Sequence, residues 1–98
     1  MVTSYYLRLR VADEAGVLAK VTGILATAGI SIDAVLQREA DEISGQAALA
    51  GRAQVPQTDV IILTHDTREG TLNDVLAQMQ ALPTVMAPIV RIRKEELN

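Results

Sequence analysis

The spacing of hydrophobic residues changes period along the first half of the chain. Over residues 5–11, apolar and polar side chains alternate, which is typical of a strand with one buried face. Over residues 17–28, the apolar residues recur at helical spacing, and Gly29 follows where a left-handed helix cap is expected. Alternation returns over residues 30–37. The first half therefore predicts a strand, a helix and a second strand.

The second half has the same order of patterns. Residues 60–64 form a β-branched and aliphatic run, as expected of a strand in the middle of a sheet. Asp66 and Glu69 have the spacing of a capping box, apolar residues at helical spacing follow, and Pro83 ends them. Residues 90–93 alternate again. This half predicts a strand, a helix and a final strand.

The two halves match when the sequence is shifted against itself, which pairs Leu7 with Ile61 and Val21 with Val75. A doubled strand-helix-strand unit forms most simply an α+β, ferredoxin-like βαββαβ sandwich, with two helices on one face of a four-stranded antiparallel sheet. Right-handed crossovers put the first and third strands in the centre. We therefore predict helices near residues 16–28 and 68–82.

Composition restricts the class of protein. The 98 residues include no Phe or Trp and only two Tyr, so an aliphatic core is expected, in a single domain over residues 1–98. The net charge of −3 argues against a nucleic-acid partner, which needs a basic surface. The absence of cysteine suits a reducing cytoplasm. No apolar run reaches the roughly 20 residues of a membrane span, so no membrane association is expected.

One face of the predicted sheet is left open, because both helices cover the other. The residues expected there are Tyr6, Arg8, Arg10, Val60, Ile62, Arg91 and Arg93. Such a strip suits a partner surface, although the arginine stems can also cover it by themselves. The second strand, residues 30–37, is an edge with few charges and favours pairing with a second copy. We therefore expect a homodimer or a larger homo-oligomer.

Residues 40–57 follow neither period and are more numerous than in an ordinary hairpin connection. They predict a loop between the second and third strands. An alternative is that residues 47–53 cover a partner or a ligand as a lid.

The sequence offers no arrangement of residues for catalysis. His65 is the only histidine, and a catalytic group needs a base and an orienting residue around the nucleophile. The acidic residues are scattered over predicted turns and do not converge as metal ligands. Gly16, Gly23 and Gly29 lack the G-x-G-x-x-G spacing of a dinucleotide site. We therefore expect no enzyme activity, metal or cofactor in this chain.

The turn at residues 11–18, between the first strand and the first helix, is the best candidate for a binding site. A glycine bend before a helix exposes backbone N–H groups at the positive end of the helix dipole, which favours a carboxylate. Asp13 can meet the ammonium group of the same ligand. The turn therefore suits a small amino acid. The alternative is that Asp13 caps the helix and Gly16 only permits the turn.

Three motifs carry a resemblance to a known family: Val-Ala-Asp at residues 11–13, Gly-Val-Leu at residues 16–18, and Gly-Ile-Ser-Ile-Asp-Ala-Val-Leu-Gln at residues 29–37. The chain resembles an ACT domain, the regulatory amino-acid-binding module of metabolic enzymes. Within that family it is most similar to the C-terminal domain of bacterial homoserine dehydrogenases. The ending Thr64-His65 of the third strand and the last strand at residues 88–93 carry this closer likeness.

The resemblance implies that the turn of one copy meets the second strand of another and encloses an effector such as threonine. The residues implied are Asp13 for the amino group, the backbone of Ala15, Gly16, Val17 and Leu18 for the carboxylate, and Ser31, Ile32 and Gln37 for the side-chain pocket. The hydride transfer and the NAD(P) cofactor of such a dehydrogenase would lie outside this domain.

Two residues depart from the family pattern. Ala15 stands where many members have proline, and Ser31 stands where many effector-binding members have asparagine. These departures leave open an alternative class, a structural oligomerisation domain without an effector. A third possibility is the ACT module of an aspartate kinase, although those enzymes usually carry paired copies.

Overall fold

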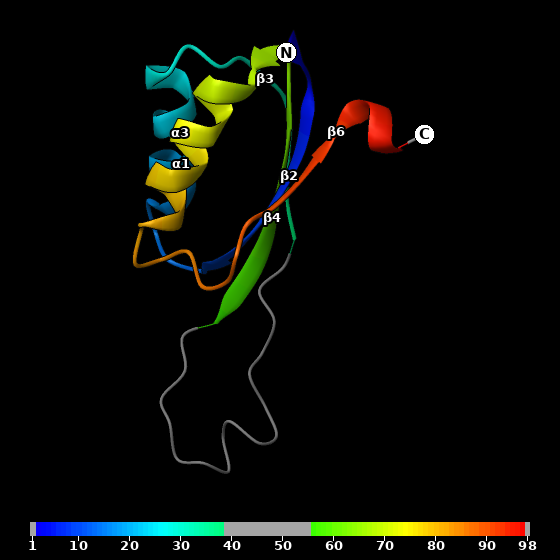
Figure 1. Ribbon diagram of the computed structural model, residues 1–98. Coiled ribbons are helices and arrows are strands. Elements are labelled where there is room, and N and C mark those ends of the chain that lie inside the picture. Colours follow the sequence, from blue (N-terminus) through cyan, green and yellow to red (C-terminus); the bar gives the residue numbers. More distant parts are fainter. Residues whose placement is uncertain (1, 39–55, 98) are drawn as a thin grey trace.

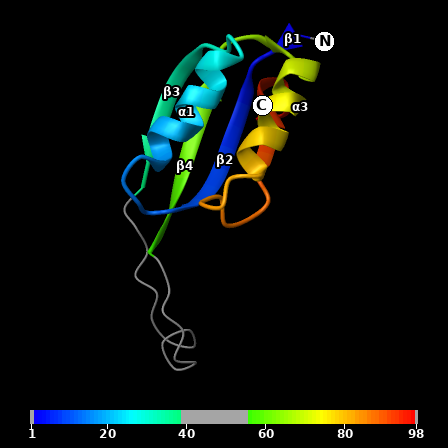
Figure 2. The same ribbon diagram turned by 90° about the vertical axis from the view of Figure 1, so that its left-hand side faces the viewer.

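The computed structural model describes residues 2–38 and 56–97. Two helices lie over one face of a sheet (Figure 1, Figure 2). The main elements are β2 (Tyr5–Ala12), α1 (Val17–Thr27), β3 (Ile32–Gln37), β4 (Gln57–Thr64), α3 (Glu69–Gln80) and β6 (Val90–Arg93). Short strands β1 (Val2–Thr3) and β5 (Thr67–Arg68) pair with each other, and a 3-10 turn, η1 (Lys94–Leu97), follows β6.

The four main strands are arranged in the order β3-β4-β2-β6, and each neighbouring pair is antiparallel. β2 and β4 are therefore central, and β3 and β6 are edges. This arrangement confirms the predicted βαββαβ fold. Both helices lie within the ranges predicted for them, because the apolar period changes where the chain leaves and rejoins the sheet.

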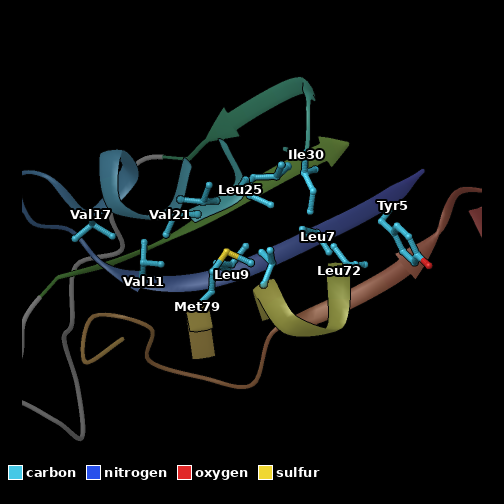
Figure 3. Packing of buried hydrophobic residues seen from close by; sticks show 13 residues of the cluster. Tyr5, Leu7, Leu9, Val11, Val17, Val21, Leu25, Ile30, Leu72 and Met79 are labelled. Carbon is cyan, nitrogen blue, oxygen red and sulfur yellow. The ribbon is translucent and has the colours of Figure 1, made fainter. Parts of the chain in front are cut away.

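The core lies between the sheet and the helices (Figure 3). Alternate residues of β2 point into it, and both helices contribute one apolar stripe. Its buried members are Tyr5, Leu7, Leu9, Val11, Val17, Val21, Leu25, Ile30, Val60, Ile62, Leu72, Val75 and Met79. Tyr5 is the single aromatic residue among these, so the expectation of an aliphatic core is confirmed.

The predicted match between the two halves is correct for the helices and wrong by one residue for the strands. Val21 and Val75 are both fully buried, as the shift predicts. The shift matches the buried Leu7 with Ile61, but the fully buried residue of β4 is its neighbour Ile62. Residues 60–63 are all aliphatic, so either phase of β4 is equally apolar, and a slip of one residue exchanges the two faces. Packing against the helices decides the phase.

The open face of the sheet also differs from the prediction. Val60 and Ile62 are buried against the helices. Arg91 lies opposite the buried Leu7, and its guanidinium group lies 3.6 Å from the Glu69 carboxylate of α3, so Arg91 and Arg93 are on the helix side. By register, the open-face residues are Tyr6, Arg8, Arg10, Ala34, Leu36, Asp59, Ile61, Leu63, Val90 and Ile92.

β3 does not alternate regularly as predicted. The register with β4 shifts between Ile32 and Ala34, which leaves Asp33 as an extra residue at a bulge. After the bulge, Val35 lies opposite Ile62, and Leu36 is turned to the open face with 59% of its surface exposed. The bulge therefore reverses the side-chain directions in the second part of the strand.

The sequence predicted a cap at the end of α1 and another at the start of α3, and only the first prediction is confirmed. At the end of α1, Gly29 has a φ of 77°, and the Ile30 N–H donates to the Leu25 carbonyl at 3.0 Å, which confirms the predicted left-handed cap. The predicted capping box of Asp66 and Glu69 is wrong. The N-cap of α3 is Arg68, without a side-chain hydrogen bond, because the preceding residues pair with β1.

The predicted loop at residues 40–57 lies largely outside the described residues, as does the alternative lid at residues 47–53. Of that range, Pro56 and Gln57 are described, and Gln57 is the first residue of β4. The third strand therefore begins earlier than the sequence pattern predicted.

Candidate functional site

The turn between β2 and α1 has the backbone conformation that the sequence suggested. Gly16 is the N-cap of α1, with φ 85° and ψ −8°, a left-handed conformation that favours glycine. Its carbonyl accepts the first helical hydrogen bond, from the Lys20 N–H at 3.0 Å. A Cβ at this position would meet no atom within 4 Å. Backbone conformation and not lack of space therefore explains the glycine.

Backbone N–H groups of this turn are available for a ligand. The Asp13 N–H donates to the Pro56 carbonyl at 2.8 Å. Over residues 2–38 and 56–97, no acceptor is found for the N–H groups of Ala15, Gly16 and Leu18. These groups lie at the N-terminal end of α1, where the helix dipole is positive. They can bind an anionic oxygen.

A hollow of about 150 Å³ lies at this turn, lined by Glu14, Ala15, Gly16, Val17, Lys20 and Thr84. It is smaller than the roughly 300–1,000 Å³ pockets that hold drug-sized ligands, so it suits a small molecule or one end of it. Glu14, Lys20 and Thr84 are additions to the predicted site, and the predicted Asp13 and Leu18 are not among the lining residues. Lys20 was detectable from its spacing, one helical turn after Gly16, whereas Thr84 comes from a distant part of the sequence.

Asp13 is exposed at the rim of the turn. α1 has no side-chain cap hydrogen bond, so the alternative that Asp13 caps the helix is wrong. Among the described residues, its carboxylate has no ion-pair partner. The charge is therefore available to an ammonium group.

The remaining predicted site residues lie on the segment that follows α1, and two of them are far from the turn. Ser31 and Ile32 follow α1, whose 11 residues span about 16 Å, so they lie at the opposite end of the helix from Gly16. Gln37 is exposed at the other end of β3, opposite Val60, which is the end of the sheet where β2 leads into the turn, but it lies on an edge strand. The structure of one chain therefore does not bring the two predicted parts of the site together.

His65 lies directly after β4. Its Nε2 atom is 3.6 Å from the Asp33 Oδ1 atom, and both side chains are more than half exposed. Within the described ranges, no group of three or more His, Cys, Asp or Glu side chains is placed to hold a metal ion. Neither of the described helices is long and apolar enough to cross a bilayer.

Comparison with known proteins now identifies the family. The sequence profile described as "ACT domain" matches residues 5–84. This chain belongs to the ACT domain family. The match includes both helices, the four strands β2, β3, β4 and β5, and the whole turn around Gly16.

The ACT domain is similar to parts of larger enzymes. It is 45% identical over 96 residues to a homoserine dehydrogenase of Methylobacillus glycogenes, covering 98% of this chain and 21% of that protein. The crystal structure of a homoserine dehydrogenase from Thiobacillus denitrificans is 42% identical, with a TM-score of 0.75, over 100% of this chain and 19% of that one. The chain therefore spans about a fifth of the length of these relatives.

A third comparison concerns the fold alone. The ACT domain from the GTP pyrophosphokinase of Chlorobium tepidum has a TM-score of 0.66 and an identity of 11%, over 94% of this chain and 100% of that one. The backbone arrangement is thus shared with an ACT domain of very different sequence.

Proposed function

We propose that this ACT domain is the regulatory, amino-acid-binding part of a homoserine dehydrogenase, and that two copies enclose an effector such as threonine. The observation that carries the proposal is the left-handed Gly16 turn, with unpartnered N–H groups beside an exposed Asp13. The similarity to homoserine dehydrogenases over nearly the whole chain supports the choice of enzyme.

The turn provides both charges that a free amino acid requires. The carboxylate would accept hydrogen bonds from the N–H groups of Ala15, Gly16 and Leu18, where the helix dipole adds to the attraction. The Val17 N–H, which donates to the Glu14 carbonyl at 3.4 Å in the structure, would have to exchange that long hydrogen bond for one to the ligand. Lys20 would contribute a positive charge at the rim of the hollow. The ammonium group would bind the Asp13 carboxylate, a charge-assisted contact.

A second copy supplies the missing half of the site in this proposal. β2 and β3 both run antiparallel to β4, so Gln37 lies at the same end of the sheet as Asp13. β3 is an edge strand, and it ends in exposed residues. Antiparallel pairing of two β3 edges would put the partner's Ser31 and the partner's Ile32 at the Gln37 end. The site would then form between one turn and the partner's β3.

In such an enzyme, hydride transfer and NAD(P) binding would be carried out by the remaining four-fifths of the protein, since this ACT domain lacks a dinucleotide fingerprint. The cysteine-free composition leads us to place the protein in the cytoplasm.

One observation favours a second candidate, a purely structural role in oligomerisation. Leu36 is 59% exposed on the open face, and Leu63 and Val90 are each 36% exposed there. A partner surface covering these side chains requires no effector. The two candidates predict different responses to free amino acids.

Calorimetric titration with threonine, isoleucine, methionine, serine and lysine tests the proposal, together with thermal melts. An effector present at 100 times its Kd should stabilise the domain by about 2.7 kcal/mol and raise its Tm. If none of these amino acids binds and the chain still forms a dimer, the structural role is the better description.

A further inference from the structure

A second hollow lies at the other end of the sheet from the Gly16 turn. Its volume is about 500 Å³, and it is lined by Ser4, Asp33, Thr64, His65, Asp66 and Lys94. Every one of these residues is polar or charged, and both signs of charge are present. Such a lining suits a small polar group rather than an apolar one.

Local backbone features bring two of these side chains together. The bulge in β3 displaces Asp33 from the regular ladder, and His65 is the first residue after β4. The His65 Nε2 atom lies 3.6 Å from the Asp33 Oδ1 atom. The pair offers hydrogen-bond donors and acceptors at the edge of the sheet.

Ser31, a residue of the predicted effector site, is hydrogen-bonded to one of the residues that line this hollow. Its carbonyl accepts a hydrogen bond from the His65 backbone N–H at 2.9 Å, which fixes the start of β3 against the end of β4. Antiparallel pairing of two β3 edges would bring this end of one copy toward the partner's Gly16 turn. The hollow would then adjoin a ligand held at that turn.

We propose that Asp33 and His65 form the side-chain-recognition wall of the effector site and select an amino acid with a polar side chain. This inference rests on the proposed function. The partner's Asp13 and turn hold the ammonium and carboxylate groups that all amino acids share. Asp33 then accepts a hydrogen bond from the polar group of the ligand's side chain, and His65 donates a hydrogen bond to it.

The chemistry favours a hydroxyl over a methyl group at this wall. A hydroxyl donates one hydrogen bond and accepts others, so it can satisfy the carboxylate and the imidazole together. A methyl group of the same size would take water away from both and replace none of their hydrogen bonds. Threonine and valine differ by this one replacement, and their affinity ratio measures the selection.

Calorimetric titration of the dimeric chain with threonine and valine tests the inference. Asp33→Ala and His65→Ala should each weaken threonine binding by about ten- to a hundredfold. Valine binding should not weaken in either variant, because the polar group that valine leaves without hydrogen bonds is removed, so the threonine-to-valine affinity ratio falls. His65→Gln, which keeps a donor and an acceptor, should recover part of the selectivity. Asp74→Ala, which removes an exposed carboxylate on α3, should change neither affinity.

The possible failures are distinguishable. If the ratio of threonine to valine affinity is unchanged in both Asp33→Ala and His65→Ala, the recognition wall is wrong. The proposed function still holds in that case if Asp13→Ala weakens the binding of both amino acids. If the unmodified chain binds no amino acid, the proposed function and this inference both fail.

Discussion

Arg10 and Asp59 lie directly opposite each other on β2 and β4, and the Arg10 Nη1 atom is 3.3 Å from the Asp59 Oδ1 atom. The Arg10 Nε–H also donates to the Gln57 side chain at 3.1 Å, and the Arg38 guanidinium lies 3.8 Å from the other Asp59 oxygen. The Asp59 carboxylate therefore joins the central strands to the residue that follows β3, and its side chain is only 23% exposed.

Asp59→Asn should lower the free energy of unfolding by about 1 kcal/mol, the upper range for cross-strand and exposed ion pairs. Urea unfolding would measure it, with Asp74→Asn as the control for loss of an exposed carboxylate. The difference should shrink in 1 M salt, where the screening length is about 3 Å. A loss that is independent of salt would contradict an ionic origin.

Leu72→Ala should destabilise the domain by about 2–5 kcal/mol, because its side chain is fully buried between α3 and the sheet and the substitution leaves a cavity. Thermal or urea unfolding gives the value. Leu76→Ala, at a partly buried position on the same helix, should cost less. Equal costs at the two positions would argue against the packing described.

Asp13→Ala should weaken amino-acid binding by about ten- to a hundredfold, the loss expected for one charge-assisted hydrogen bond. The melting temperature without ligand should stay nearly constant, since Asp13 is exposed and does not cap α1. One titration and one melt decide the matter. Full affinity in the variant would remove Asp13 from the proposed site.

Gly16→Val and Gly29→Val form a matched pair, because both glycines have a positive φ and open space around a new Cβ. Each should lose about 1–2 kcal/mol of stability from backbone strain. Only Gly16→Val should also abolish amino-acid binding, since its side chain fills the approach to the N–H groups of the turn. Calorimetry on both variants, at a temperature where they stay folded, checks this. Equal binding by the two would show that the turn is not the site.

Leu36→Lys should weaken self-association, because a charge on an exposed edge strand opposes pairing with a second copy. Sedimentation velocity over a concentration series would measure the dimer dissociation constant. Val2→Lys is a suitable control, because Val2 is also 59% exposed and lies outside the sheet that contains β3. A dimer that tolerates Leu36→Lys as well as Val2→Lys must form through another surface.

The sequence by itself determined the order of the six main elements and the position of both helices. Apolar spacing changes from two to about 3.6 at Val17, and Gly29 and Pro83 mark where a helix cannot continue in its regular geometry. The doubled pattern then left one simple arrangement of the main sheet. It also indicated the Gly16 turn, because a glycine just before a helix is typical of a left-handed backbone conformation, which other residues rarely adopt.

Tertiary structure decided which side of each strand faces the helices. In β4 every residue from Val60 to Leu63 is aliphatic, and in β6 the alternation of arginine and aliphatic residues has two possible phases. In β4, the register with β2 selects the phase in which Ile62 is buried in place of Ile61. In β6, the contact of Arg91 with Glu69 shows that the arginines are on the helix side.

The other contacts that the sequence did not predict join residues that are distant in sequence. Thr84 reaches the Gly16 turn, His65 approaches Asp33, and β1 pairs with β5 only because the chain folds back on itself. Local patterns carry information about the period of a segment and its ends. They do not predict which other segment a helix or strand contacts in the folded domain, because those contacts depend on the packing of the whole domain.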